Sequence, residues 1–421
     1  MDSTSVSFKE SEFVKYSVSS SEESIRDARV SFVRFMVNWA TNFQGNAVQS
    51  FELCLSKPFE FETEIKHLVE FAVSKQVKNL VLDFSDLSCT ASNEARPAVV
   101  FQLPECVESL ATIESLKLFA CGFDPSRFAK PSSFKSLSFG YIQLGNTIMT
   151  VLSKSPLLEC LIIRNCWNVG LESITEDNSL LRELSIENCD FATSYTLLDL
   201  PNIEIFKYCG SFHYFQFLRV NRRMEEAYLD YGTETDGDEN GTPLCDLLYD
   251  LLSAKKLTVC PFLIKAIKDS DDPVKLKAPM ETRHLVIKTS LVPDEFVGIR
   301  LMLNSSPELE TLTFQMVPPL VPAAPRTNLG FNPKSYWAYP INHKCLKKTL
   351  KVVEVRNFSG GGYELVMVRF LMRSGRVLER VDLYSPVGAS VSEKSSAHAR
   401  MNTLAEERVA SERLCIRLHD G

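Results

Sequence analysis

A short apolar phrase recurs along this chain and constrains its fold more than any other feature. The phrase has the form L-x-x-L-x-L-x-x-C, and its strict and looser copies begin at Val77, Ile113, Phe134, Leu158, Leu181 and Ile203. The second apolar anchors of these copies are Leu80, Leu116, Leu137, Leu161, Leu184 and Phe206. After Leu116, successive anchors are separated by 21, 24, 23 and 22 residues. The middle of the chain is therefore predicted to be an array of similar units.

This spacing lies within the roughly 20–29 residue period of leucine-rich repeats. The L-x-L segment predicts a short strand with one buried face, and the residues after it suit short helices or 3₁₀ turns. A single unit cannot bury its apolar face, so the units must stack. The predicted fold is an α/β leucine-rich-repeat solenoid, in which a curved parallel sheet carries helices and 3₁₀ turns on its convex side. Cys121, Cys166 and Cys189 at the phrase ends are expected to be buried, reduced thiols.

The phrase continues less regularly towards the C-terminus. Copies begin at Arg283, Leu309, Leu350 and Leu378, and a last strand is expected from Leu414. An acidic insertion at 230–243 and a proline-rich segment at 317–345 interrupt the array. The aromatic end of the second insertion (Tyr336, Trp337 and Tyr339) is expected to pack against the body of the protein.

The start of the chain differs in composition from the repeats. Residues 1–24 hold nine serines and few apolar residues, so we expect a flexible tail there. Ser24 is a candidate N-cap of a helix over 25–47. An apolar stripe of that helix, at helical spacing, comprises Phe32, Phe35 or Met36, Trp39 and Phe43. This helix is expected to cap the N-terminal end of the solenoid, ahead of a repeat region at 48–275.

Charge and hydropathy exclude several function classes. The chain has 46 Lys and Arg against 53 Asp and Glu, a net charge of −7. It therefore lacks the basic excess expected of a nucleic-acid binder or of a protein held on an anionic membrane. No stretch reaches the roughly 18 apolar residues of a membrane-spanning helix. Without a secretory signal pattern, the expected location is the nucleus, the cytoplasm or both.

The search for catalytic and metal-binding patterns returns nothing specific. The twelve cysteines include no C-x-x-C pair, and the six histidines are isolated from other metal ligands. Asp236, Asp238 and Asn240 begin an EF-hand-like spacing, but the twelfth position is Leu247 instead of Glu. The glycines at 360–362 suit a strand-to-helix turn, with a phosphate-binding nest as the alternative. We predict no catalytic residue, no metal and no cofactor.

The remaining candidate is the concave face of the predicted sheet, since alternate residues of each strand point outward there. On this interpretation the partner-binding residues are Lys117, Phe119, Arg164, Glu187, Lys288, Gln315, Arg356 and Tyr384. Arginine and aromatic side chains among them suit a protein partner. The alternative is that most of them are ordinary solvated residues.

The phrases at 283–316 and 336–386, together with LSKSPLLECLIIRNCWNV from Leu152, closely resemble those of plant F-box/FBD/leucine-rich-repeat proteins. The resemblance implies that the solenoid continues into an FBD domain at 276–421. It also implies substrate recognition in a Skp–cullin–F-box ubiquitin ligase, with no catalysis by the chain itself. Residues before Val48 do not match the family's F-box pattern, which begins L-P-x-E-I-L. Binding of a Skp-type adaptor is thus not implied by these residues, and a stand-alone scaffold or competitor is the alternative.

Overall fold

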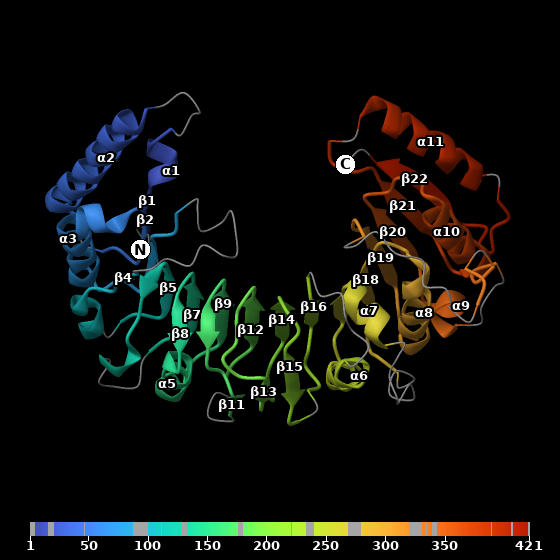
Figure 1. Ribbon diagram of the computed structural model, residues 1–421, viewed down its shortest axis with the longest axis horizontal. Helices are drawn as coiled ribbons and strands as arrows, with labels where there is room; N and C mark the ends of the chain where they lie inside the picture. Colours follow the sequence, from blue (N-terminus) through green and yellow to red (C-terminus); the bar gives the residue numbers. More distant parts are fainter. Residues whose placement is uncertain are drawn as a thin grey trace. The chain divides into compact units, whose positions relative to one another are not determined.

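The computed structural model resolves the chain into two compact units, Met1–Ile203 and Glu204–Gly421. It describes residues 5–15, 21–45, 47–86, 100–110, 112–127, 133–175, 180–219, 221–232, 240–267, 279–319, 331–333, 335–338, 343–388, 390–405 and 407–419. Each unit consists of a parallel sheet whose strands are joined by helices, 3₁₀ turns and short second-layer strands (Figure 1).

Unit 1 is built on seven parallel strands in chain order. They are β1 (Ser5–Lys9), β2 (Ser50–Cys54), β3 (Asn79–Asp83), β5 (Ser115–Phe119), β7 (Ser136–Gly140), β9 (Cys160–Arg164) and β12 (Glu183–Glu187). Its helical connections are α1 (Glu10–Phe13), α2 (Glu22–Asn42), η1 (Pro58–Phe61), α3 (Glu62–Ser74), η2 (Glu105–Ser109), η3 (Pro125–Arg127) and α5 (Thr147–Lys154). Its short second-layer strands are β4 (Phe101–Gln102), β6 (Cys121–Gly122), β8 (Gln143–Gly145), β10 (Trp167–Val169), β11 (Ser173–Ile174) and β13 (Tyr195–Leu198).

The predicted anchors of unit 1 meet in one row across the sheet. Leu80, Leu116, Leu137, Leu161 and Leu184 are directly paired from strand to strand, and all five are fully buried. This confirms the repeat prediction, because only a shared register places residues 21–36 positions apart side by side. The stacked row gives each strand the apolar neighbours that it cannot supply alone.

The N-terminal segment differs from the expectation of a flexible tail. Residues 5–9 form β1, which pairs with β2 in parallel and buries Val6 and Phe8 on the core side. The serines at alternate positions face outward, so a serine-rich composition conceals a period-two strand. The prediction for 1–24 is therefore wrong over β1 and α1.

Helix α2 also differs from its predicted role. The Oγ of Ser21, not of Ser24, caps the helix by accepting a hydrogen bond from the Ser24 backbone N at 3.2 Å. Because α2 connects β1 to β2, it is the crossover of the first repeat and not a lid over the end of the array. Phe32 and Met36 are buried in its core-facing stripe, whereas Phe35 is half exposed.

The residue directly after several strands adopts the left-handed region of backbone space. Ala120, Tyr141, Asn165 and Asn188 follow β5, β7, β9 and β12 with φ between 49° and 56°. This conformation turns the chain inward, and the next residue of the phrase is then buried. Cys166 and Cys189 are such residues, and their thiols donate to the carbonyls of Arg164 (3.4 Å) and Glu187 (3.3 Å). The expected burial of the phrase-end thiols is confirmed.

We expect a β-branched residue at one of these turns to destabilise unit 1. Asn165, with φ of 50°, tolerates the left-handed region, whereas Val does so at a steric cost. Asn165→Val should lower the free energy of unfolding by about 1–2 kcal/mol. Asn165→Gly is the control and should stay within about 0.5 kcal/mol of wild type. Urea unfolding followed by circular dichroism measures both, and equal losses would refute the conformational explanation.

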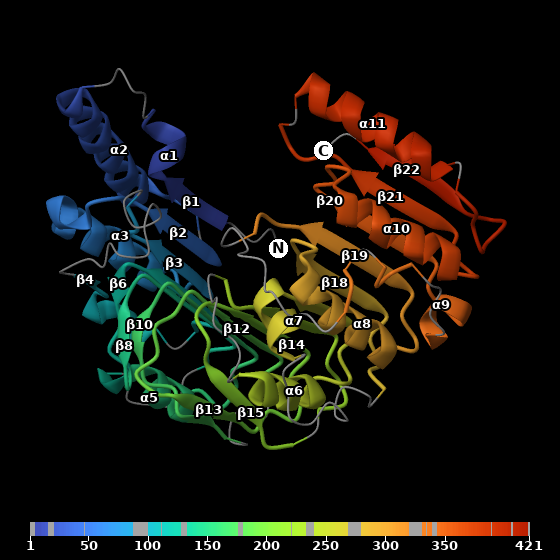
Figure 2. The same ribbon diagram turned by 45° about the vertical axis from the view of Figure 1, so that its right-hand side comes forward.

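Unit 2 repeats the plan with eight parallel strands. They are β14 (Ile205–Cys209), β16 (Glu226–Asp230), β17 (Lys256–Val259), β18 (His284–Thr289), β19 (Thr311–Met316), β20 (Val352–Arg356), β21 (Arg380–Tyr384) and β22 (Cys415–His419). Its other elements are β15 (Tyr214–Phe217), α6 (Gly241–Asp250), α7 (Pro261–Ile267), η6 (Pro293–Glu295), α8 (Phe296–Ser305), α9 (Lys344–Lys348), α10 (Gly362–Ser374) and α11 (Val391–Ala405). Helices α8 and α10 lie along one face of this sheet (Figure 2).

The C-terminal copies of the phrase all form strands of unit 2, as predicted. The aromatic residues of the proline-rich segment also pack as expected where they are described. Trp337 is buried, with its ring centroid 5.7 Å from that of Phe296 and 4.8 Å from that of Phe370. Tyr336 stacks on Phe296 at 5.7 Å, whereas Tyr339 lies outside the described residues.

Candidate functional site

The outward face of each sheet has a row of side chains at the last outward position of its strands, which we call the rim row. In unit 1 the rim row comprises Lys9, Cys54, Asp83, Phe119, Gly140, Arg164 and Glu187. In unit 2 its continuous part comprises Lys288, Gln315, Arg356, Tyr384 and His419. Seven of the eight predicted partner-binding residues therefore belong to a rim row.

The rim row of unit 1 brings together three of the predicted residues. The Phe119 ring lies over Gly140, where an added Cβ would come within 2.4 Å of a ring carbon. On the next strands, Arg164 Nε pairs with Glu187 Oε2 at 3.1 Å. Lys117 lies two positions earlier on β5, exposed on the same face. The row thus offers an aromatic surface beside a solvent-accessible ion pair.

The rim row of unit 2 aligns the other four predicted residues on β18 to β21. Arg356 pairs with Glu354 of its own strand at 3.1 Å. Tyr384 stacks on His419, with ring centroids 4.6 Å apart and an interplanar angle of 18°. His419 Nε2 lies 3.1 Å from Asp382 Oδ1, which fixes the imidazole against the sheet. In the sequence His419 is an isolated histidine. The register of β22 brings it beside Tyr384, which the sequence alone does not show.

Lys288 belongs to the rim row, but its ammonium group is bound by two side chains of strand β16. Its Nζ lies 2.6 Å from Asp230 Oδ2 and also donates to the Tyr228 hydroxyl, although both partners lie two strands away on β16. Burial opposes the charge, but the hydrogen bonds to Asp230 and Tyr228 outweigh it and raise the pKa of Lys288. Strand β17 ends at Val259, one position before the level of Asp230 and Lys288, and Cys260 at that level is buried.

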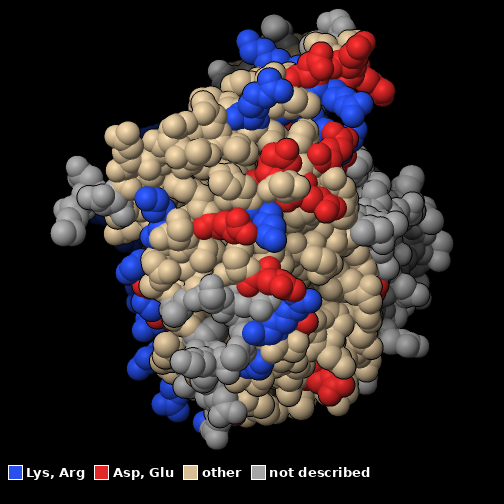
Figure 3. Space-filling view, turned by 90° about the vertical axis from the view of Figure 1, so that its left-hand side faces the viewer, with Lys and Arg blue, Asp and Glu red and all other residues tan. Residues whose placement is uncertain are grey.

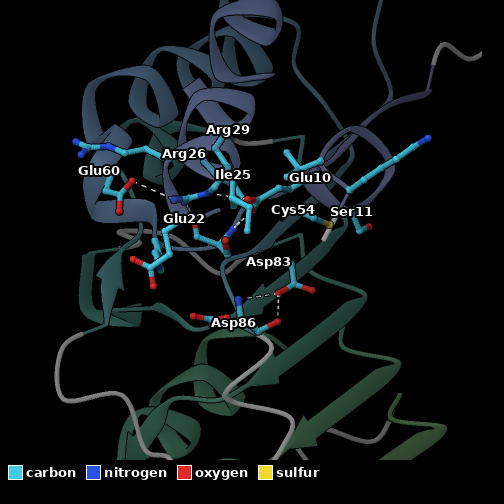
Figure 4. A pocket seen from close by; sticks show the side chains of 16 residues that line it. Glu10, Ser11, Glu22, Ile25, Arg26, Arg29, Cys54, Glu60, Asp83 and Asp86 are labelled. Carbon is cyan, nitrogen blue, oxygen red and sulfur yellow. Dashed lines mark hydrogen bonds and ion pairs between the residues drawn. The ribbon is translucent and has the colours of Figure 1, made fainter. Parts of the chain in front are cut away.

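A pocket of about 970 Å³ lies beside the rim row of unit 1, where β2 and β3 end. Its floor is an ion pair between Arg29 Nε and Glu10 Oε1 at 2.7 Å, with both side chains more than nine-tenths buried (Figure 4). Arg29 Nη1 also contacts Glu60 Oε2 at 3.0 Å, and Glu10 Oε2 accepts from the Ser56 backbone N at 2.6 Å. No sequence pattern indicates this pocket, because it exists only once β1 joins the sheet.

The other candidate sites are filled or lie partly outside the described residues. Glu364 fills the turn before α10, where its Oε2 accepts hydrogen bonds from the backbone N of Ser359 and Gly360 at 2.9 and 2.8 Å. The phosphate-nest alternative is therefore disfavoured, since a carboxylate already holds the donors. Leu247 is buried in α6, while Asp236 and Asp238 are not among the described residues. The described part of the chain contains no group of three or more potential metal ligands.

Charged side chains of both signs lie on the surface of the protein. Figure 3 shows acidic and basic side chains interspersed among uncharged ones across one face of the molecule. None of the described helices has the length and apolarity needed to cross a membrane.

Comparison with known proteins places two domain types on the chain. The model described as At1g61320/AtMIF1, LRR domain, matches residues 40–361, and the FBD model matches residues 343–383. The F-box protein At3g62230 of Arabidopsis thaliana is 44% identical over 424 residues, covering 99% of this chain and 90% of that protein. The putative F-box/LRR-repeat protein At1g56400 of the same plant is 40% identical, covering 94% and 85%. The F-box/FBD/LRR-repeat protein At1g13570, also from Arabidopsis thaliana, is 28% identical, covering 73% and 66%.

Proposed function

Because the chain belongs to the plant family of F-box/LRR-repeat proteins with an FBD domain, we propose that it is a non-catalytic protein-recognition module. In this proposal the rim rows bind a protein partner, as the substrate receptor of a Skp–cullin–F-box ubiquitin ligase does. The observation that carries it is the alignment of an aromatic and an Arg side chain in one row of each unit, with a carboxylate paired to each Arg.

The chemistry of the rim rows supports a protein partner over other ligands. Phe119 and Tyr384 each provide a flat apolar surface, the type of side chain that carries most binding energy at protein interfaces. The nearby pairs Arg164–Glu187 and Arg356–Glu354 remain accessible to solvent, so they can exchange partners with an incoming chain. Both signs of charge are present, which suits a protein surface better than a polyanion.

We expect substitutions in either rim row to abolish capture of the partner. The variants are Phe119→Ser with Arg164→Glu in unit 1, and Arg356→Glu with Tyr384→Ser in unit 2. The control, matched in net charge, removes exposed charges on the helices, with Arg34→Gln on α2 and Lys66→Gln on α3. Quantitative mass spectrometry of proteins captured from plant extract should show a set retained by wild type and control and lost from the rim-row variants. An identical captured set for all four proteins would contradict the proposal.

A stand-alone scaffold or competitor is the second candidate function. It is supported by the fold of β1, α1 and α2, which belong to the first repeat and so do not act as a separate adaptor-binding module. Co-elution of the chain with a Skp-type adaptor separates the two candidates, with the F-box protein At3g62230 as the positive control. Co-elution supports a receptor coupled to a ligase. Failure to co-elute, with a positive control that does, supports the competitor.

A further inference from the structure

The pocket beside the rim row of unit 1 offers a second kind of contact to a protein partner. Cys54 and Asp83 belong both to the rim row and to the pocket lining. A partner segment that lies along Phe119 and Asp83 therefore reaches the pocket without leaving the sheet. With a volume of about 970 Å³, the pocket lies at the upper end of the usual range for ligand sites. It is therefore large enough for one side chain of a partner together with part of its backbone.

The floor of the pocket carries no spare positive charge. Arg29 is the buried cation, and it contacts the carboxylates of both Glu10 and Glu60. One guanidinium faces two carboxylates, so these three side chains together have a net charge of −1. A buried and doubly paired arginine is a structural element and a poor receptor for an added anion.

The opposite wall is acidic. Figure 4 shows Glu22, Asp83 and Asp86 across the pocket from the Arg29–Glu10 pair. Asp83 Oδ1 accepts hydrogen bonds from the Ser85 backbone N at 3.0 Å and from the Ser85 hydroxyl at 2.6 Å, which hold the carboxylate in place. Of the described residues, none forms an ion pair with Glu22, Asp83 or Asp86.

The pKa of Cys54 is affected by the negative charge of the carboxylates around it. Burial, followed by the carboxylates of Asp83 and Glu52, raises the pKa of this thiol to about 12. Lys9 opposes the shift but is itself paired with Glu52 at 3.3 Å. The basic lining residues Lys15, Arg26 and Lys57 are exposed, and Figure 4 draws the Arg26 side chain beyond Glu60, away from the acidic wall.

We propose that this pocket binds a Lys or Arg side chain of a partner polypeptide, in a site formed by Asp83, Asp86 and Glu22. The inference rests on the proposed function, because it takes the rim row of unit 1 as the path of that polypeptide. The carboxylates receive the cation, and the aliphatic stem packs against Ile25, which lines the same pocket. Arginine and carboxylate pairs of this kind give directional, charge-assisted hydrogen bonds.

The test uses the full chain and three capped pentapeptides of sequence Gly-Ser-X-Ser-Gly. X is Arg, its neutral isostere citrulline, or Glu, and binding is titrated by saturation-transfer NMR. We expect the Arg peptide to bind at least about 10-fold more tightly than the other two, and more weakly as salt is added. The Asp83→Asn, Asp86→Asn double variant should lose at least about 10-fold in affinity. Glu172→Gln, which neutralises one exposed carboxylate outside the pocket, should leave the affinity unchanged.

Ile25→Trp is a second variant that fills the pocket without changing its charge, and it should also block the Arg peptide. This variant keeps the test decisive if the aspartate variants unfold. Equal binding of the citrulline peptide, a preference for the Glu peptide, or an equal loss in Glu172→Gln would overturn the inference. No binding of the Arg peptide would also overturn it. If rim-row variants still abolish partner capture in that case, the proposed function stands and only the pocket assignment fails.

Discussion

Arg29→Met should destabilise unit 1 by about 3–5 kcal/mol, the usual cost of leaving one member of a buried ion pair unpaired. The Arg29 and Glu10 side chains are only 4% and 6% exposed. Removing the guanidinium takes away the cation beside Glu10 Oε1, while Oε2 still accepts from the Ser56 backbone N at 2.6 Å. Since Glu10 follows β1 directly, the loss should be felt first in β1, α1 and the start of α2.

A matched control separates burial from charge. Lys78 pairs with Glu114 at a similar distance, 3.0 Å, but is half exposed, so Lys78→Met should cost less than about 1 kcal/mol. Urea unfolding with hydrogen exchange of the α1–α2 peptides measures both variants, and peptides from β18 and β19 serve as the reference in unit 2. A cost below about 1 kcal/mol for Arg29→Met would show that the pair is structurally dispensable.

The strands could be predicted because their signal is local. Each anchor, such as Leu116 or Phe206, stands in a phrase that repeats along the chain, and stacking forces these phrases into one register. The strands that escaped prediction lack that phrase. β1 presents serines at alternate positions, β2 has the sequence SFELC, and β17 has only four residues. Their pairing depends on neighbours in space and not on their own sequence.

The sequence could likewise predict which residues of the candidate site point outward, but not which residues they contact. Alternation along a strand identifies outward residues, so Phe119, Arg164 and Tyr384 could be chosen from the amino-acid sequence alone. The contacts of those residues could not be chosen in this way. Lys288 and Asp230 are 58 residues apart, and they meet across the chain because β17 ends one position before their level. The pocket depends likewise on β1, whose serines conceal its period.

We expect the second large effect in acid, where two buried histidines of unit 2 should weaken its fold. Burial lowers the pKa of His213 and of His343 to about 4, and the Arg300 guanidinium contributes at His343. His343 Nδ1 lies 3.2 Å from Asn304 Oδ1, while Nε2 is buried with no acceptor among the described residues. In the unfolded chain each histidine binds a proton below about pH 6.5, whereas in the folded unit it does so only below about pH 4. Stability is therefore fully present above pH 6.5 and falls as the pH drops towards 4, by about 3 kcal/mol per histidine.

Glu295 opposes this trend. Burial raises the pKa of its carboxyl to about 7, against the hydrogen bond from Thr289 and the charge of Lys265. Between about pH 4.5 and 7 the folded unit keeps a proton that the unfolded chain has released, so this group loses stability as the pH rises. Two histidines against one glutamate leave a net uptake of about one proton on unfolding between about pH 5 and 6.5. One buried acid thus cancels about half of the acid sensitivity of the two imidazoles.

The two histidines and Glu295 change the free energy of unfolding with pH in opposite directions. Each single variant should therefore have a different dependence of this free energy on pH. Wild type should lose about 1.4 kcal/mol of unfolding free energy per pH unit between about pH 6.5 and 5, the value for one proton. Glu295→Gln should double this slope, because both histidines then act unopposed. His343→Gln should bring the slope close to zero, since His213 and Glu295 then cancel. Urea unfolding of the three proteins at about pH 5, 5.8 and 6.5, followed by exchange of β18–β19 peptides, gives the slopes directly. Equal slopes in all three would show that neither His343 nor Glu295 changes its proton affinity on folding.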